Sequence, residues 1–524
     1  MLLTSLVFLA ATAWAAPTSD ADAVCSYLVD KYPRYVAWDP LNINGYKTAA
    51  NASKWANAHT AYWDRRNQYN RATCAFFPSN AEMVSDAVKQ LNKYTNAPFA
   101  IKSGGHQFNK GFSSVDKGVL ISFNENLSSA VRSSDGNSFV VGSGARWGDV
   151  YTEAGKTNQV VVGGRLSHIG VGGFTLGGGL SYYSAQYGLA CDNVLNYEAV
   201  LPDGTIANIN AQSTEYSDLF WALKGGGNRF AIVTRFTLKA HPAGVNGQVW
   251  GGTRTYAAEN RAQIFDSLSK FVANYPDKKA ALIPTHDFTL GVLDVLIVFM
   301  FYDGPDPGNV FADFDKIPSI SSSTEAKTYR EMTDEAGGAS VQGFSTAARV
   351  TTFPNMPPEQ MNAFYEEHFQ VYAKRSLNNT VRDLDLQVLT FTPQPLSRVV
   401  AQASQDAGGN TLGLDPKYGD RIWIENDVIW LNPLCDNACP TYLKDAADTM
   451  VAYQAKTFPG AGPTNFQSGD KNFASYNPLF MNDAADYQNV YASYGSENEA
   501  RLKSIQKKYD PNGFMFRQGG FKFF

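Results

Sequence analysis

The residues best suited to chemistry lie in a short loop that ends in a histidine. Residues 101–108 read Ile-Lys-Ser-Gly-Gly-His-Gln-Phe. Gly104 and Gly105 lack Cβ, so the backbone here can approach a flat or anionic ligand closely, and its N–H groups can form an anion-binding concavity. The imidazole of His106 can act as base, ligand or nucleophile. The alternative is a turn with an incidental histidine.

A second glycine-rich stretch follows at 169–180, with Gly-Val-Gly-Gly at 170–173 and three glycines at 177–179. Thr175 stands where the third glycine of a GxGxxG turn would be, which disfavours a nicotinamide-binding Rossmann site. The backbone of 170–173 can instead donate to a pyrophosphate. For 177–179, close backbone packing and ligand contact are equally good interpretations.

Several blocks in order between residues 74 and 242 resemble the FAD-linked oxidases of the vanillyl-alcohol oxidase superfamily, and most of all its berberine-bridge-enzyme-like members. The resemblance implies FAD bonded covalently through its 8α carbon to His106. A second, cysteinyl bond is not expected, because Leu166 stands in the cysteine's place. His168 lies near the flavin or is a hydrogen-bonded structural histidine, and we favour the second. The other implied cofactor-binding residues are Lys102, Ser103, Gly104, Gly105, Gly170, Gly172, Gly173 and Ile232.

The catalytic base is harder to assign. The family often has a Tyr-x-Asn-Tyr stretch near the C-terminus, and the aligned residues 480–483 read Phe-Met-Asn-Asp. Asp483 and Tyr487 are the resulting candidates for a proton acceptor, and Tyr476 is a further substitute. The alternative for Asp483 is a turn cap or a backbone hydrogen bond.

The resemblance implies an enzyme, an FAD-dependent oxidoreductase. Its partners would be a small organic substrate, which we expect to be a specialised (secondary) metabolite, and dioxygen, which would yield hydrogen peroxide. The missing cysteine and tyrosine favour such a substrate over a sugar. The alternatives are an oligosaccharide oxidase of the same fold, a flavin-binding protein with little turnover, and a redox-neutral flavin enzyme.

The N-terminal residues and the sequons indicate the cellular compartment of the protein, and the net charge bears on its partners. Residues 1–13 are apolar and uncharged, and Ala-Trp-Ala at 13–15 fits a signal-peptidase site, which predicts secretion or a secretory-pathway compartment. Sequons at Asn51, Asn126 and Asn378 agree with glycosylation. A net charge of −5 without a basic run gives no support for nucleic-acid binding. No later segment suggests a membrane anchor.

Five cysteines fit an oxidising compartment. The resemblance implies a Cys25–Cys74 disulfide, and Cys435 and Cys439 form either a small disulfide loop or two separate thiols. Cys191 is then unpaired. No Cys or His lies nearby with ligand spacing, so no metal site is expected.

The elements that must position these residues indicate an α+β protein. We expect a two-part FAD-binding domain of the PCMH type and a substrate domain with an antiparallel sheet covered by helices. The expected divisions are 1–15 (signal peptide), 16–73, 74–242 (FAD-binding), 243–477 (substrate-binding) and 478–524, which returns to the FAD domain. Ser79 should cap a helix over 80–91. Strand patterns occur at 99–101, 119–123, 138–141, 160–162, 230–238, 292–302, 384–392 and 421–430, and helix patterns at 257–275, 358–374 and 442–458.

Overall fold

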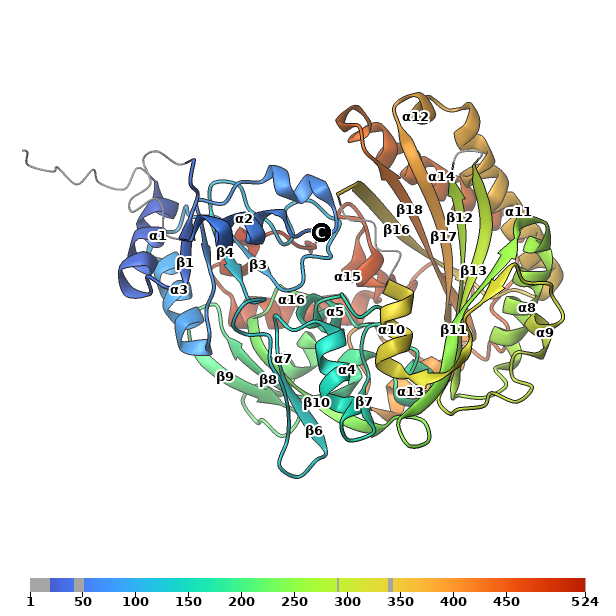
Figure 1. The fold of residues 1–524 in the computed structure, drawn as a ribbon, viewed down its shortest axis with the longest axis horizontal. Helices are drawn as coiled ribbons and strands as arrows, with labels where there is room; N and C mark the ends of the chain where they lie inside the picture. Colours follow the sequence, from blue (N-terminus) through green and yellow to red (C-terminus); the bar gives the residue numbers. More distant parts are fainter. Residues whose placement is uncertain (1–18, 42–50, 290–291, 338–342, 524) are drawn as a thin grey trace, which may run out of the picture.

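The computed structural model describes residues 19–41, 51–289, 292–337 and 343–523. Its helices and sheets fall into two parts that lie side by side (Figure 1). Strands up to residue 242 form two smaller sheets, and strands from residue 248 to 430 form one large antiparallel sheet. The expected α+β class, with an antiparallel sheet covered by helices, is confirmed.

The first sheet carries the histidine loop at the end of one of its strands. Its order is β1-β2-β4-β3, with β2, β4 and β3 parallel and β1 antiparallel to β2. Helices α1 (Asp20–Lys31) and α3 (Ala81–Lys93) share a hydrophobic core with it. The strands are β1 (Val36–Trp38), β2 (Cys74–Phe76), β3 (Phe99–Lys102) and β4 (Val119–Ser122).

The second sheet shares its hydrophobic core with the segment that contains the other glycine-rich turns, residues 170–179. Its order is β5-β6-β10-β8-β9, and β7 also pairs with β10. Its strands are β5 (Ala130–Arg132), β6 (Ser138–Gly142), β7 (Gln159–Val161), β8 (Val194–Val200), β9 (Ile206–Asn210) and β10 (Ile232–Pro242). The helices around it are α4 (Trp147–Gly155), α5 (Val171–Leu176), α6 (Ser184–Tyr187) and α7 (Ser217–Leu223).

The third sheet has eight strands among the described residues, in the order β14-β11-β13-β12-β17-β18-β16, with β15 beside β11. Helices α8 (Arg261–Asn274), α11 (Pro358–Tyr372) and α14 (Ala438–Thr457) cover one face and bury its apolar residues (Figure 1). The strands are β11 (Gln248–Ala257), β12 (Ala280–Thr289), β13 (Leu293–Tyr302), β14 (Ser321–Ser322), β15 (Glu325–Thr328), β16 (Ser345–Pro354), β17 (Leu386–Leu396) and β18 (Arg421–Trp430).

The chain returns to its first half at the end. Helix α16 (Ser496–Tyr509) packs into the same core as the second sheet. Arg229, buried, donates to the carbonyls of Met515, Gln518 and Phe521. The remaining helices are α2 (Ala52–Thr60), α9 (Ala312–Asp315), α10 (Tyr329–Gly337), α12 (Thr380–Asp383), α13 (Arg398–Asp406) and α15 (Val490–Ser493).

The expected elements are present, with one correction at a helix cap. Ser79 does not cap α3. Asn80, in extended conformation directly before the first helical residue, accepts from the amide of Met83 at 2.9 Å. Both residue types cap helices well, and only the backbone geometry decides which side chain reaches the third amide.

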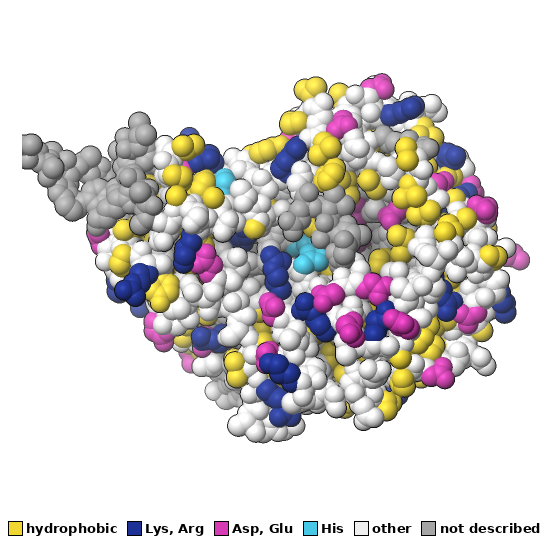
Figure 2. Space-filling model, in the orientation of Figure 1, with side chains coloured by type: hydrophobic (Ala, Val, Ile, Leu, Met, Phe, Trp, Pro, Cys, Tyr) yellow, Lys and Arg dark blue, Asp and Glu magenta, His cyan; other side chains and the backbone are white. Residues whose placement is uncertain are grey.

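Both expected disulfides are confirmed, Cys25–Cys74 and Cys435–Cys439, and Cys191 is a free, buried thiol. Among the described residues, no helix has the length and apolarity needed to span a membrane. The expected signal peptide, 1–15, lies outside those residues. Basic and acidic side chains are interspersed over the face in Figure 2.

Candidate functional site

His106 follows strand β3 and packs among other rings. The centroid of its imidazole lies 4.5 Å from that of Trp63 and 5.1 Å from that of His168. Burial, with smaller contributions from His168 and Arg146, lowers the pKa of His106 to about 3. The imidazole is therefore neutral at physiological pH, with a nitrogen lone pair free to bond to carbon.

The two glycine turns meet backbone to backbone beside this histidine. A Cβ on Gly104 would lie 2.6 Å from the Cα of Gly170, and Gly105 has a φ of 75°. Gly173 is exposed, and a Cβ added there would meet nothing within 4 Å. The turns thus present bare backbone next to open space, which fits a ligand with a pyrophosphate and a flat ring.

Hydrogen bonds hold the turns together. The hydroxyl of Ser103 donates to the carbonyl of Ser143 at 2.6 Å and accepts from the amide of Gly172 at 3.3 Å. This fixes the first turn against the start of helix α5. Ser103 therefore shapes the cradle, and its hydroxyl already has two protein partners.

Two other predicted cofactor residues lie deeper. Lys102 is buried with its ammonium 3.7 Å from the centroid of the Tyr62 ring, and it donates to the carbonyl of Ala58. Burial lowers the pKa of Lys102 to about 7. Ile232 is 2% exposed, at the start of β10. Lys102 thus supports the loop from behind.

Arg146, which sequence reasoning missed, ties the turns together from the side. Its guanidinium donates to the carbonyl of His168 and, at 3.4 Å, to that of Gly104. The Nε2 atom of His168 is buried and has no hydrogen-bond partner within the described residues. We expected a hydrogen-bonded structural histidine; instead its ring stands beside His106 with Nε2 unsatisfied.

Four partly buried carboxyl groups form a second wall, the acidic wall. Asp287 lies on β12, Glu425 and Asp427 on β18, and Asp483 in a short turn that follows the third sheet in the chain. Thr390 of β17 pairs with Asp287 on one side and with Asp427 on the other. Directly paired residues share a face, so Asp287, Asp427 and Glu425, two residues before Asp427, project from the sheet face that α8, α11 and α14 leave uncovered.

Burial is the largest cause of a raised pKa at each carboxyl. The pKa rises to about 6 at Asp287 and Asp483 and to about 7 at Asp427, and it rises well above the usual value at Glu425. Repulsion among the carboxyls adds to the effect at Glu425 and Asp427, while Arg165 opposes it at Glu425 and Asp483. Such groups can accept and release protons near neutral pH.

Asp483 is the predicted base that the structure brings into this wall. Its carboxylate accepts from the side-chain amide of Gln394 at 2.7 Å, and the same nitrogen donates to Glu425 at 3.3 Å. This partner is a side chain on β17, whereas a turn cap would bind backbone. Gln394 therefore joins the C-terminal loop to the third sheet.

The acidic wall lies next to the two glycine turns. Arg165, whose charge acts on Glu425 and Asp483, is three residues before His168. Asn482 accepts from the amide of Gly179 at 3.3 Å. A Cβ on Gly177 would lie 2.7 Å from Asn482, which supports close packing as the role of 177–179.

The tyrosine candidates lie elsewhere. Tyr487 is 42% exposed, with the Arg349 guanidinium 5.8 Å from its ring centroid. Tyr476 donates to the carbonyls of Leu412 and Gly413. Neither contacts the acidic wall in any described interaction, so Asp483 is the better-placed candidate.

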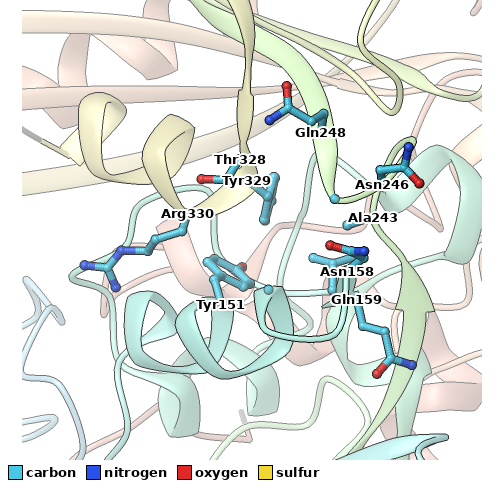
Figure 3. Close-up of a pocket in the computed structure, with 12 residues that line it drawn as sticks. Tyr151, Asn158, Gln159, Ala243, Asn246, Gln248, Thr328, Tyr329 and Arg330 are labelled. Atoms are coloured by element: carbon cyan, nitrogen blue, oxygen red, sulfur yellow. The ribbon is translucent and has the colours of Figure 1, made fainter.

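Figure 3 shows a different pocket, where α4 and β7 meet β11 and the start of α10. Tyr151, Asn158, Asn246 and Gln248 are among its lining residues, and the Arg330 guanidinium points out of it. No residue of the glycine turns or of the acidic wall lines it. The candidate site is therefore not this pocket.

Sequence reasoning missed Trp63, Gln394 and three of the four carboxyls. One signal was available. Glu425 and Asp427 lie two residues apart in an otherwise largely apolar strand, which is typical of a strand whose one face is polar. Nothing in the sequence indicates that Asp287 and Asp483 join them. Within the described ranges, no three His, Cys, Asp or Glu side chains are placed to hold a metal.

Comparison with known proteins agrees with this geometry. Residues 72–210 match the family model "FAD binding domain". An uncharacterized FAD-linked oxidoreductase of Arthroderma benhamiae is 30% identical over 478 residues, which cover 90% of this chain and 91% of the relative.

Two solved structures share the fold. The structure of 6-hydroxy-D-nicotine oxidase from Arthrobacter nicotinovorans has a TM-score of 0.71 at 17% identity, covering 93% of this chain and 97% of the other. The glucooligosaccharide oxidase of Acremonium strictum, described as carrying a 6-S-cysteinyl, 8α-N1-histidyl FAD, has a TM-score of 0.68 at 18% identity, with coverages of 94% and 97%. The chain therefore shares the fold of these two oxidases and belongs to the FAD-linked oxidoreductases.

Proposed function

We propose that this FAD-dependent oxidoreductase oxidises a small specialised metabolite, uses dioxygen as electron acceptor and releases hydrogen peroxide. FAD would be bonded covalently through His106 alone. The observation that carries the proposal is the neutral His106 beside a bare glycine cradle, with the acidic wall next to it. Bound FAD supplies the two-electron redox chemistry.

The protein's own residues would hold the cofactor and move the substrate's proton. His106 would anchor the ring system, and the turns around Gly104 and Gly170 would hold the pyrophosphate. Asp483, whose pKa is raised to about 6 by burial, would accept the proton of the substrate's hydroxyl or amine group. Glu425 shares the Gln394 amide with Asp483 and can hold a proton next to it.

Two departures from the sugar-oxidising pattern support a specialised metabolite. Leu166 stands in place of the second flavin-linked cysteine, and Asp483 stands where the family's tyrosine is expected. An oligosaccharide oxidase of the same fold is the second candidate, favoured by the similarity to the Acremonium strictum enzyme.

We further propose secretion after removal of residues 1–15, and the division of the chain at 73/74, 242/243 and 477/478. Among the three sequons, Asn126 and Asn378 are exposed and Asn51 is half-buried. The amide nitrogens of Asn51 and Asn126 donate to the carbonyls of Val36 and Phe77. Asn378 is thus the best-placed glycan acceptor, and peptide mapping of the natural protein tests this.

The purified protein should keep its yellow colour in an acid-precipitated pellet, with flavin on the His106 peptide alone by mass spectrometry. His106→Ala should leave a colourless pellet. A substrate panel followed by peroxide detection then separates the candidates. Peroxide with aromatic or amine metabolites supports the first, and peroxide only with oligosaccharides supports the second. Bound flavin that no compound reduces points to a binding protein, and product without peroxide points to a redox-neutral reaction.

A further inference from the structure

A short segment between α2 and β2, residues 62–67, binds the loop on both sides of His106. We call this segment the brace. Three carbonyl groups within two residues of His106 accept hydrogen bonds from it: Gly105 from the amide of Trp63 at 2.9 Å, Gln107 from the side chain of Asn67 at 3.1 Å, and Phe108 from Arg66 at 3.3 Å.

Asn67 is the centre of this contact. It is fully buried, and its Oδ1 accepts from the amide of Gly111 at 3.1 Å and from the hydroxyl of Ser114 at 2.7 Å. One side chain therefore binds the loop at Gln107 and again at Gly111. The loop needs such support, because Gly105 and Gly111 both have positive φ and impose little stiffness of their own.

Trp63 restrains the imidazole itself. Its ring centroid lies 4.5 Å from that of His106 and 5.9 Å from that of His168, and the planes of Trp63 and His168 are within 17° of parallel. The indole thus packs against both histidines of the flavin site. The backbone bond from Trp63 to Gly105 fixes the indole relative to the loop that it restrains.

The other side of the brace is attached to the third sheet. The amide of Arg65 donates to the carbonyl of Phe344 at 2.8 Å, and the amide of Thr346 on β16 donates to Asp64 at 3.2 Å. The guanidinium of Arg66 lies 4.9 Å from the ring centroid of Trp430, at the end of β18. The brace therefore connects the His106 loop to the strand that carries Glu425 and Asp427.

We propose that the brace positions His106 for its bond to the flavin, with Asn67 and Trp63 as the positioning residues. This inference rests on the proposed covalent attachment. Forming the bond replaces one C–H of the flavin methyl group by C–N and releases two protons and two electrons, which dioxygen accepts to give hydrogen peroxide. Rates of such steps fall steeply when the reacting atoms are misplaced by about 1 Å, so the loop must be held from outside.

Asn67→Ala tests the proposal, with Asn193→Ala as matched control. Asn193 is also buried, donates to two carbonyls, those of Tyr187 and Leu189, at 2.8 and 2.9 Å, and lies in the same part of the protein. The proteins are produced under flavin limitation and supplied with FAD in air. Acid-resistant flavin is followed in time, together with total bound FAD, the mass of the His106 peptide and the thermal midpoint.

We expect attachment to be at least about tenfold slower in Asn67→Ala and unchanged in Asn193→Ala at a comparable loss of thermal stability. Trp63→Ala should also slow attachment, while Trp63→Phe, which keeps an aromatic ring over the imidazole, should restore most of the rate. The backbone bond of residue 63 is the same in both variants, so their difference reports the ring.

Attachment at the wild-type rate in Asn67→Ala, or an equal loss in Asn193→Ala, would overturn the inference while leaving the proposed function intact. A wild-type protein that binds FAD without ever attaching it would instead refute the covalent bond in the proposed function. The two failures are therefore distinguishable from the wild-type sample alone.

Discussion

Burial and the hydrogen bond from the Gln394 amide determine the pKa of Asp483 and so its ability to accept a proton. Its pKa of about 6 means that it is mostly ionised above pH 6 and can then accept a proton. We expect Asp483→Asn to slow substrate-dependent flavin reduction by about 10² to 10⁴ and to abolish the rise in rate between pH 5 and 7. Stopped-flow absorbance over pH measures both. A normal profile in Asp483→Asn with a large loss in Tyr487→Phe would show that the tyrosine is the base.

The carboxyl group of Asp427 lowers the free energy of unfolding by an amount that depends on pH. Its folded-state pKa, about 7, is above the unfolded value, because burial favours the protonated form. Between about pH 4 and 7 the folded protein then binds more protons than the unfolded chain, so this group lowers the free energy of unfolding as pH rises. We expect Asp427→Asn to raise that free energy by up to about 4 kcal/mol at pH 8 and by little at pH 4. Urea unfolding at both pH values checks this, and equal effects at the two would contradict it.

At the scale of elements, the two glycine turns can form a ligand cradle only because their backbones are in direct contact. A Cβ at Gly104 would lie 2.6 Å from backbone atoms of Gly170, which cannot move aside as a flexible side chain would. We expect Gly104→Ala to reduce bound FAD at least about tenfold, an effect of about 1.4 kcal/mol or more. Gly155→Ala is the control, because nothing lies within 4 Å of a Cβ there. Flavin absorbance per protein measures both, and full loading of Gly104→Ala would refute the contact.

At the scale of the whole molecule, the disulfides differ in what they restrain. Cys25–Cys74 joins residues 49 apart, linking α1 to the first sheet, whereas Cys435–Cys439 spans only 4. Loop-closure entropy gives about 4 kcal/mol for the first and about 2 kcal/mol for the second. The double Ser variants should follow that order in calorimetric melting. A reversed order would mean that native contacts, and not the unfolded chain, dominate.

Much of the fold followed from local sequence. The strand at 421–430 and the helix at 358–374 match β18 and α11 closely, because side-chain periodicity and caps act over a few residues. The choice between Ser79 and Asn80 as cap did not follow, since both side chains can accept a hydrogen bond from a helix amide and only backbone conformation decides between them.

For the site, the sequence by itself indicated the two glycine turns and His106 as candidates, because glycine sets the backbone freedom of a loop locally. Asp483 was reached only through family resemblance. The tertiary structure alone decided that Asp287, Glu425, Asp427 and Asp483 share a wall, since strand register brings the first three onto one face and the Gln394 side chain binds Asp483 to them. Their raised pKa values, and that of His106 lowered to about 3, are likewise products of burial, which exists only in the folded chain.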